Sequence, residues 1–342
     1  MLAPLLRRLI AHEDLTSEEA GAAMTEIMAG RATPALISAF LVGLAMKGER
    51  PEEIVGLART MRAEAVPFDT AGRTVFDTCG TGGDRSGTFN ISTAASLVIA
   101  ACGVAVAKHG NRSVSSLCGS ADVFEALGVR VAAPPEAAEH WLRVAGIAFL
   151  FAPTFHPSMR HAAPTRRELG VRTAFNLLGP LTNPARPARQ LVGVPRPEHA
   201  ELLARALLLL GAERAWVVHG ADGLDEISLS GHTKVAECWQ GAVRTFYVHP
   251  ADFGLPKAPV AALAGGDAAA NAAIVRRVLD GEPGAARDVV LLNAAAGLFV
   301  AGSAASFQEG VAAAAGAIDS GRARATLDAL VTASRAPEGE PA

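Results

Sequence analysis

The hydrophobic positions of residues 4–65 follow a helical pattern. Apolar residues such as Leu5 and Leu9 recur at spacings of three and four, which places them on one face of an α-helix. Thr16 and Glu19 have the spacing of a capping box, and Pro51 stands where a first helical residue is expected. The pattern therefore predicts four short helices with no strand between them, which is typical of a small helical bundle.

After residue 73 the pattern changes to short apolar segments that alternate with helical text. We expect strands at residues 74–76, 104–107, 129–131, 147–151, 191–194 and 215–218. Strands and helices in repetition predict an α/β fold with a mainly parallel sheet flanked by helices. Residues 235–248 favour an antiparallel addition to that sheet.

These patterns predict two domains. We expect a small all-helical domain at residues 1–70 and a large α/β domain at residues 71–342. Residues 157–187 contain Pro, Arg and Gly and interrupt the alternation, so we expect this stretch to rejoin the small domain or to cross a hinge.

The charge balance excludes a strongly basic or acidic protein. The chain has 31 Lys and Arg against 34 Asp and Glu, a formal net charge of -3, so no global field would attract nucleic acid. The 4 cysteines have no zinc-type spacing, and no apolar segment is long enough to span a membrane. Without a signal-peptide pattern either, we expect a cytoplasmic protein that binds neither membrane nor nucleic acid.

A glycine-rich turn at residues 77–84 precedes a polar segment at residues 88–93 and then a helix. Glycine exposes backbone N–H groups, and a helix start adds its positive dipole end, so the stretch suits a phosphate group. It matches neither common nucleotide loop, since Arg85 stands where a dinucleotide motif needs glycine and no Walker lysine follows. A plain turn with Ser and Thr helix caps would have the same composition.

A second polar cluster, residues 108–116, also lies between a strand and a helix. In a parallel sheet this loop and the glycine-rich turn leave the same edge, where such folds bind ligands. The cluster combines the cations of Lys108 and Arg112 with an amide and several hydroxyls. His109 alone is more typical of a hydrogen-bonded turn residue.

Two further clusters contain charged side chains. Asp225 and Glu226 follow an expected strand and suit magnesium, although solvated loop acids are the ordinary alternative. Arg166 lies in a stretch that includes His156 and residues 172–184. Its guanidinium could pair with a substrate carboxylate, and ordinary helix surface charge is the alternative.

Together these motifs closely resemble anthranilate phosphoribosyltransferase. The match extends over nearly the whole chain and includes residues 80–84, 88–93, 108–112, 119–122, 172–181 and 222–228 in the same order. The resemblance implies a homodimer of two-domain subunits, joined through the small helical domain, with the active site between the domains. It also implies transfer of a phosphoribosyl group from phosphoribosyl pyrophosphate (PRPP) to anthranilate.

The resemblance also implies a set of site residues. Those expected around PRPP are Gly80, Gly83, Asp84, Thr88, Asn90, Ile91, Ser92, Thr93, Lys108, His109, Gly110, Asn111, Arg112, Ser113, Val114, Ser115, Ser116 and Ser120. Those expected to meet anthranilate are Gly80, Asn111 and Arg166, with Arg166 facing the carboxylate. Ser92, Asp225 and Glu226 would hold two Mg²⁺ ions per subunit, partly through water. No residue is assigned as an acid or base.

One departure and two alternatives accompany the resemblance. Arg85 occupies a position where the family usually has a small residue, commonly glycine, which affects the flexibility or the charge of the phosphate loop. A pyrimidine nucleoside phosphorylase-like enzyme would use inorganic phosphate and would not need Asp225 and Glu226. A nucleic-acid-binding relative on the same fold would need a basic face, and Asn111 and Arg166 would not be retained for anthranilate.

Overall fold

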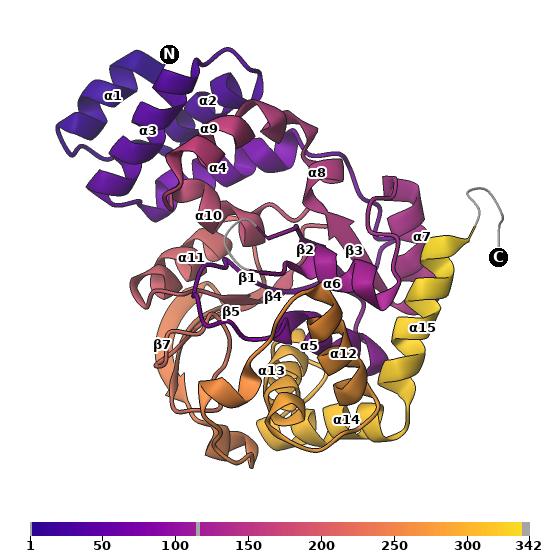
Figure 1. The fold of residues 1–342 in the computed structure, drawn as a ribbon. Coiled ribbons are helices and arrows are strands. Elements are labelled where there is room, and N and C mark those ends of the chain that lie inside the picture. Colours follow the sequence, from indigo (N-terminus) through magenta and orange to yellow (C-terminus); the bar gives the residue numbers. More distant parts are fainter. Residues whose placement is uncertain (1, 114–116, 337–342) are drawn as a thin grey trace.

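A bundle of four helices forms the N-terminal part of the molecule (Figure 1). The computed structural model describes residues 2–113 and 117–336. The helices are α1 (Leu2–Ile10), α2 (Ser17–Met28), α3 (Pro34–Lys47) and α4 (Pro51–Ala63). Thr16 and Glu19 form both bonds of the predicted capping box, and Thr33 accepts from the Leu36 N–H. The prediction of four short helices with no strand between them is confirmed.

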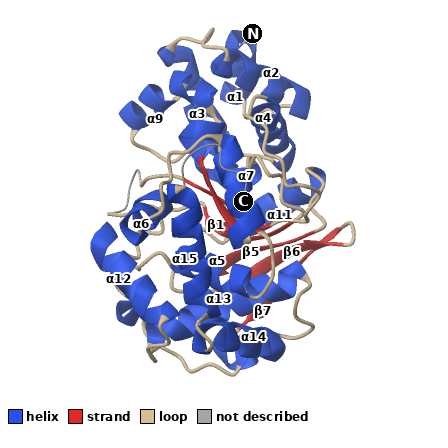
Figure 2. Ribbon diagram, turned by 90° about the vertical axis from the view of Figure 1, so that its right-hand side faces the viewer, coloured by secondary structure: helices blue, strands red, loops and turns tan. Residues whose placement is uncertain are grey.

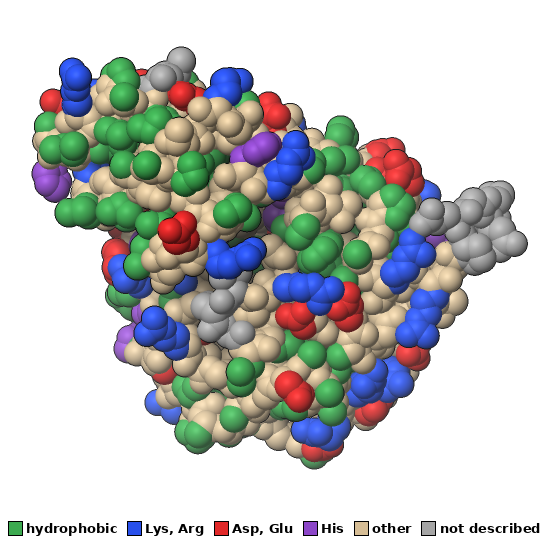
Figure 3. Space-filling view, turned by 45° about the horizontal axis from the view of Figure 1, so that its top comes forward, with side chains coloured by type: hydrophobic (Ala, Val, Ile, Leu, Met, Phe, Trp, Pro, Cys, Tyr) green, Lys and Arg blue, Asp and Glu red, His purple; other side chains and the backbone are tan. Residues whose placement is uncertain are grey.

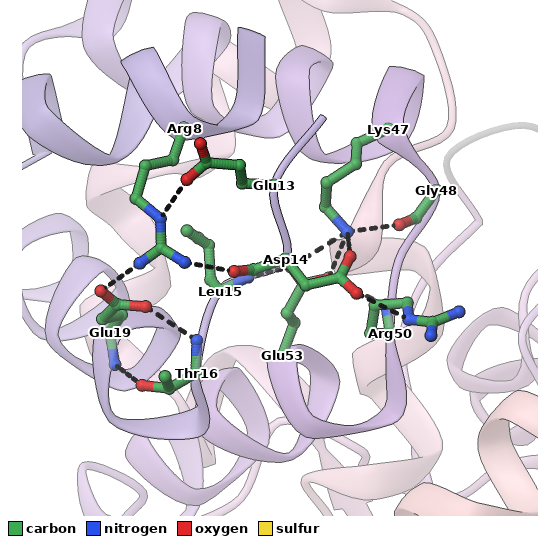
Figure 4. A network of polar contacts seen from close by, with 10 residues as sticks. All are labelled: Arg8, Glu13, Asp14, Leu15, Thr16, Glu19, Lys47, Gly48, Arg50 and Glu53. Carbon is green, nitrogen blue, oxygen red and sulfur yellow. Dashed lines mark hydrogen bonds and ion pairs between the residues drawn. The ribbon is translucent and has the colours of Figure 1, made fainter. Parts of the chain in front are cut away.

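A network of ion pairs joins the loops of this bundle (Figure 4). Its members, named the helical-domain network below, are Arg8, Glu13, Asp14, Glu19, Lys47, Arg50 and Glu53. The ammonium of Lys47 lies 2.8 Å from Asp14 and 3.1 Å from Glu53, and its side chain is only 2% exposed. Buried Glu53 also accepts from the backbone N–H groups of Leu15 and Arg50. Every buried charge therefore faces an opposite charge.

The large part of the chain contains one seven-stranded sheet in the order β3-β2-β1-β4-β5-β6-β7 (Figure 2). Its strands are β1 (Phe76–Gly80), β2 (Val106–Gly110), β3 (Ile147–Phe151), β4 (Arg189–Gly193), β5 (Arg214–Gly220), β6 (Thr233–Trp239) and β7 (Ala242–Val248). The first five are mutually parallel, and β6 and β7 pair antiparallel. The predicted fold class and the antiparallel addition are confirmed.

Two details of the strand prediction are wrong. Residues 129–131 form no strand: Val129 and Val131 are buried in the connection from α6 (Ser120–Leu127) to α7 (Pro135–Ala145). An apolar pattern indicates that residues are buried but does not show whether they pair in a sheet. The buried connection was for this reason predicted as a strand. β1 and β2 also end later than expected, because the polar residues Asp77 and Lys108 lie inside the sheet, where they are buried.

Helices cover both faces of the sheet and create two hydrophobic cores. One core includes α5 (Ile91–Ala101), α6, α7, α12 (Ala268–Leu279), α13 (Ala285–Ala301), α14 (Phe307–Asp319) and α15 (Arg322–Arg335). The other includes α11 (Glu198–Leu209) and continues into the helical bundle. This second core makes the bundle part of one packed unit with the sheet.

The segment between β3 and β4 returns to the helical bundle. It contains α8 (Ala152–Phe155), η1 (Pro157–His161), α9 (Ala163–Leu169), α10 (Ala174–Leu178) and η2 (Gly179–Leu181). Helix α9 packs on α3, and α10 packs on α3 and α4. The boundary between domains at residue 70 stays a prediction. In the part of the chain that the structure describes, no helix is both long and apolar enough to cross a membrane.

Candidate active site

The loops that follow β1, β2 and β5 meet at the carboxyl edge of the sheet. The N–H of Gly82, after β1, donates to Asp225, after β5, at 2.8 Å. A Cβ on Gly80 would lie 2.2 Å from the Asp225 carboxylate, and one on Gly193 would lie 1.5 Å from the Asp225 carbonyl oxygen. Glycine at these two strand ends therefore leaves room for the loop that contains Asp225 and Glu226, called the acidic loop below. The expected convergence of the loops is observed.

The acidic loop is connected to the start of α5 and to β2. The N–H of Ser92 donates to Glu226 at 3.1 Å. The Lys108 ammonium, on a side chain that is 1% exposed, donates to the Thr78 carbonyl and lies 3.4 Å from the Ser92 hydroxyl. Three of the predicted site residues, Ser92, Lys108 and Glu226, are thus neighbours although their elements are far apart in sequence.

The two carboxyl groups of the acidic loop, those of Asp225 and Glu226, lie in an environment that disfavours their negative charge. Burial raises the pKa of Asp225, and repulsion from Asp84 raises it further. Burial likewise raises the pKa of Glu226, with added repulsion from Asp225 and partial compensation by Lys108. Such a carboxylate cluster, beside the Ser92 hydroxyl, has the donor chemistry that a hard divalent cation requires.

The described residues contain no group of three or more His, Cys, Asp or Glu side chains arranged around a metal. Magnesium takes one or two protein carboxylates and completes its shell with water and substrate phosphate oxygens. Asp225, Glu226 and Ser92 therefore fit magnesium better than zinc, which takes four protein ligands in structural sites and three in catalytic sites, with Cys and His common among them.

The glycine-rich loop is held from the opposite side by residues 263–271. The N–H of Phe89 donates to the Leu263 carbonyl at 3.0 Å, and Asn271 donates to Asn90 at 2.9 Å. Arg85 is exposed and has φ of 58°, the left-handed conformation that glycine adopts without strain. The departure from the family pattern therefore falls at a backbone position where a small residue is easier to accommodate.

The start of α5 offers both satisfied and unsatisfied polar groups. The Thr93 hydroxyl is buried without a hydrogen-bond partner among the described residues, and a ligand oxygen could supply one. The Thr88 hydroxyl, by contrast, has a partner, because it lies 3.2 Å from the Ser86 hydroxyl. Ile91 is a core residue whose N–H donates to Phe89, so its side chain is directed to packing.

The loop after β2 turns tightly into α6. A Cβ on Gly110 would lie 2.3 Å from the Ser120 hydroxyl, and the Asn111 carbonyl accepts from the Ala121 N–H. Arg112 forms ion pairs with Asp122 and Glu125, so its guanidinium already has protein partners. Ser113 donates its N–H to Asp122. The predicted residues Val114, Ser115 and Ser116 lie outside the described residues.

Two buried histidines lie together below this loop. The rings of His109 and His156 are 5.2 Å apart, and His109 Nδ1 contacts the Gly179 carbonyl at 3.2 Å. Burial lowers the pKa of His109 to about 3 and that of His156 to about 4. Both rings are therefore neutral at pH 7, and they provide polar but uncharged surface.

Arg166, on α9, is half-buried with its guanidinium 4.8 Å from the centre of the Phe175 ring. Burial lowers its pKa. No ion pair to Arg166 occurs among residues 2–113 and 117–336. A planar guanidinium fixed by an aromatic ring keeps its donors for a carboxylate.

Sequence reasoning did not assign a role to Arg172. Its guanidinium donates to the Gly82 carbonyl and lies 3.5 Å from the Thr81 hydroxyl. This contact connects the segment between β3 and β4, residues 152–188 and called the crossing segment below, to the glycine-rich loop. Asp225 and Asp84 both act electrostatically on this half-buried group. The signal was available, because Arg172 belongs to the motif at residues 172–181, but only the tertiary contacts assign it to the loop.

The molecule combines a helical bundle with an α/β domain, and loops suited to phosphate lie at the carboxyl ends of its parallel strands. This combination is that of a class of glycosyl transferases. Residues 72–324 match the model of the glycosyl transferase family, a/b domain, and residues 3–65 match that of the glycosyl transferase family, helical bundle domain. Anthranilate phosphoribosyltransferase of Moorella thermoacetica is 55% identical, with 97% of this chain and 98% of that protein covered. The chain belongs to the anthranilate phosphoribosyltransferase family.

Solved structures agree in fold over nearly the full length. The Thermus thermophilus anthranilate phosphoribosyltransferase has a TM-score of 0.92 and 48% identity, covering 97% of this chain and 99% of that one. The Saccharomyces cerevisiae enzyme in complex with PRPP and Mg has a TM-score of 0.89 and 27% identity, covering 97% of each chain. Neither the nucleoside phosphorylase nor the nucleic-acid-binding alternative is supported.

Proposed function

We propose that this chain transfers the phosphoribosyl group of PRPP to the amine of anthranilate. The products are N-(5-phosphoribosyl)anthranilate and pyrophosphate. The observation that carries the proposal is the meeting of Asp225, Glu226, Ser92 and Lys108 around a glycine-rich loop at one sheet edge. Membership in the anthranilate phosphoribosyltransferase family supports the same reaction.

PRPP would lie over the two loops after β1 and β2. Backbone N–H groups near Gly80 and Gly83, together with the start of α5, suit its phosphates. Lys108 would stabilise negative charge on the leaving pyrophosphate, since its ammonium is already desolvated and directed at Ser92. The unpartnered hydroxyl of Thr93 would donate to a phosphate or ribose oxygen.

Ser92, Asp225 and Glu226 would hold magnesium, and two ions per subunit is the stoichiometry we propose. The bound ions would neutralise charge on the pyrophosphate as the bond to the ribose breaks. The related yeast enzyme was solved with PRPP and Mg. The raised pKa of both carboxyl groups supports the assignment, because a cation would relieve the repulsion between them.

Anthranilate would lie between the crossing segment and the loop after β2. Arg166 would pair with its carboxylate, while Asn111 and Gly80 would contact its ring and amine. An aromatic amine is neutral at pH 7, so attack on the ribose carbon needs no strong base, and the amine proton leaves afterwards. Neutral His109 and His156 fit this reaction, and catalysis comes mainly from positioning and charge stabilisation.

A fluorescence assay tests the proposal directly. Purified protein mixed with anthranilate, PRPP and Mg²⁺ should convert the anthranilate, so that its fluorescence decreases with time. Omission of any one component should prevent this decrease. Arg166→Ala should raise the KM for anthranilate by about 10-fold or more, because the carboxylate loses a charged partner. Constant fluorescence with all three components would overturn the proposed function.

We also propose a homodimer formed through the helical domain. Ile10 on α1 and Met46 on α3 are 78% and 75% exposed, and these two helices pack together. Hydrophobic side chains are visible over this part of the surface in Figure 3. Ile10→Glu with Met46→Glu should halve the mass measured by light scattering, and an unchanged mass would reject this interface. The cytoplasmic location expected from the sequence stays a prediction.

A further inference from the structure

A cavity lies at the opposite edge of the sheet from the proposed active site. Its volume is about 440 Å³, and its lining comes from the end of α4, the turn before β4 and the end of α11. The charged lining residues are Arg59, Arg62, Arg186 and Glu213. Because β4 runs from this edge to the carboxyl edge, the strand separates the two sites. The cavity is large enough for a small sugar phosphate.

The three arginines have backbone carbonyls as their hydrogen-bond partners. Arg59 donates to Leu209 at 3.0 Å and Arg62 donates to Leu181 at 2.6 Å. Arg186 donates to the carbonyl of Arg62 at 3.4 Å. Each guanidinium has five N–H donors, so one recorded bond leaves most of them available to an anion.

No carboxylate forms an ion pair with these arginines within the described ranges. Glu213, the one acid in the lining, pairs with Arg189 at 3.3 Å. Outside the lining, Glu18 has a lowered pKa, caused first by its own backbone and by Thr16 and to a smaller extent by Arg59. The positive charge of the cavity is therefore poorly compensated.

The cations also affect one another. Arg62 is half-buried, and burial together with repulsion from Arg186 and Arg59 lowers its pKa to about 10. Arg186 is held at φ of 47°, a left-handed conformation that is unfavourable for a residue other than glycine. Two unfavourable features thus coincide at one cavity, one electrostatic and one in the backbone.

Capping of helix ends explains only part of this arrangement. Arginines near the last turn of a helix satisfy free carbonyls, as Arg59 does for α11 and Arg62 does for η2, which ends at Leu181. One cation is enough for each helix end. Capping requires neither the third guanidinium, that of Arg186, nor guanidinium groups close enough to repel each other.

We propose that the Arg59–Arg62–Arg186 cavity is a second anion site that binds a small phosphate monoester such as a sugar phosphate. Its phosphate accepts bidentate bonds from the guanidinium groups, which match phosphate geometry. Arg59 and Arg62 lie on the helical bundle, whereas Arg186 and Glu213 lie beside the sheet. A bound ligand therefore contacts both sides of the junction between bundle and sheet.

Calorimetric titration tests this site in the full-length protein with its proposed active site filled by a single equivalent of PRPP with Mg²⁺, without anthranilate, because PRPP in excess carries a phosphate monoester that would itself compete for the cavity. Ribose 5-phosphate should then still bind, with a dissociation constant of about 0.1–1 mM. Inorganic phosphate should bind more weakly, and ribose should not bind. Failure of PRPP itself to bind would count against the proposed function, and the titration without PRPP would then decide the cavity alone.

Arginine variants locate the binding. Arg62→Gln with Arg186→Gln should weaken ribose 5-phosphate binding at least 10-fold, while Arg205→Gln, at an exposed arginine on α11 outside the cavity, should leave it unchanged. If circular dichroism shows that the double variant is unfolded, Arg59→Gln decides, with at least 3-fold weaker binding expected. Absence of binding to the PRPP-bound protein, or equal affinity in the folded cavity variants, overturns the proposal.

Discussion

Two clusters of charged side chains in this molecule are built on opposite principles. In the helical-domain network, Lys47 lies between Asp14 and Glu53, so each buried charge has an opposite neighbour (Figure 4). At the carboxyl edge of the sheet, Asp225 and Glu226 instead repel each other. The first cluster is electrostatically complete by itself, whereas in the second Lys108 compensates the repulsion only in part, and a bound cation would relieve the rest.

The comparison indicates that the helical-domain network stabilises the fold, whereas the carboxylates at the sheet edge are suited to bind a ligand. Removing one member of a paired, buried cluster leaves an uncompensated charge and destabilises the fold. Removing like charges relieves repulsion, so the fold keeps its stability while the ligand site is lost. Charge removal in the two clusters should therefore have opposite effects on stability and on turnover.

The largest expected effect is on turnover at the sheet edge. Asp225→Asn with Glu226→Gln should lower kcat by about 10⁴-fold, because the proposed magnesium ligands lose their charge. The urea midpoint should stay the same or rise, since repulsion between the half-buried carboxylates of Asp225 and Glu226 is removed. Glu282→Gln, at an exposed acid in an ion pair elsewhere, is the matched control and should change neither value. A large fall in the urea midpoint of the double variant would contradict the comparison.

The reverse effect is expected in the helical-domain network. Glu53→Gln should lower the free energy of unfolding by about 3 kcal/mol, since Lys47 is almost fully buried beside it. Turnover per folded molecule should not change. Arg50→Ala, at a side chain that is 60% exposed in its pair with Asp14, should cost less than about 1 kcal/mol. Equal losses in these two variants, measured by urea unfolding, would show that burial does not set the strength of this network.

Acid sensitivity should come from the histidine pair below the site. Both rings are held neutral in the folded state, with the pKa of His109 about 3 and that of His156 about 4, against 6.5 as the ordinary value. Unfolding therefore takes up protons below pH 6.5, and stability that is complete above pH 6.5 is lost progressively as the pH falls toward 3. By pH 4 the loss should be roughly 3 kcal/mol per ring.

His156→Leu tests this assignment, because it removes one titrating ring and retains an apolar side chain. The slope of unfolding free energy against pH between 6.5 and 4 should become smaller in the variant. An unchanged slope in His156→Leu would assign the acid sensitivity to other groups.

The smallest expected effect concerns the contact of Arg172, in the crossing segment, with the glycine-rich loop. Arg172→Gln should raise the KM for PRPP by about 10-fold, because the bond to the Gly82 carbonyl and the charge facing Asp225 are both lost. Arg172→Lys keeps the charge and should be intermediate. Arg167→Gln, at an exposed arginine on α9, should match the wild type. An unchanged KM in Arg172→Gln would make the contact purely structural.

Local chemistry explains which parts of the fold were predictable. The capping box of Thr16 and Glu19, the proline that begins α4 and the buried strand β3 depend on neighbouring residues, and the structure has all three as expected. Residues 129–131 were misassigned because an apolar segment is buried equally well in a connection as in a strand. The strand ends of β1 and β2 were misplaced because Asp77 and Lys108 are polar yet buried.

The site shows the same division. Loops after parallel strands must leave one edge of a sheet, so the meeting of the two phosphate-type loops could be predicted from order and direction. The role of Arg172 could not, because its partners Thr81 and Gly82 lie about 90 residues away in sequence. The pairing of His109 with His156 depends in the same way on how the crossing segment packs.

The sequence by itself determined the element types, the order of strand and helix and the polar residues available at each strand end. Those features follow from periodicity, caps and turn chemistry, which act within a few residues. Only the tertiary structure decided which charges are paired and which are left to repel. That choice depends on burial and on distances between elements such as α4 and α11 or β1 and β5, and no local pattern encodes those distances.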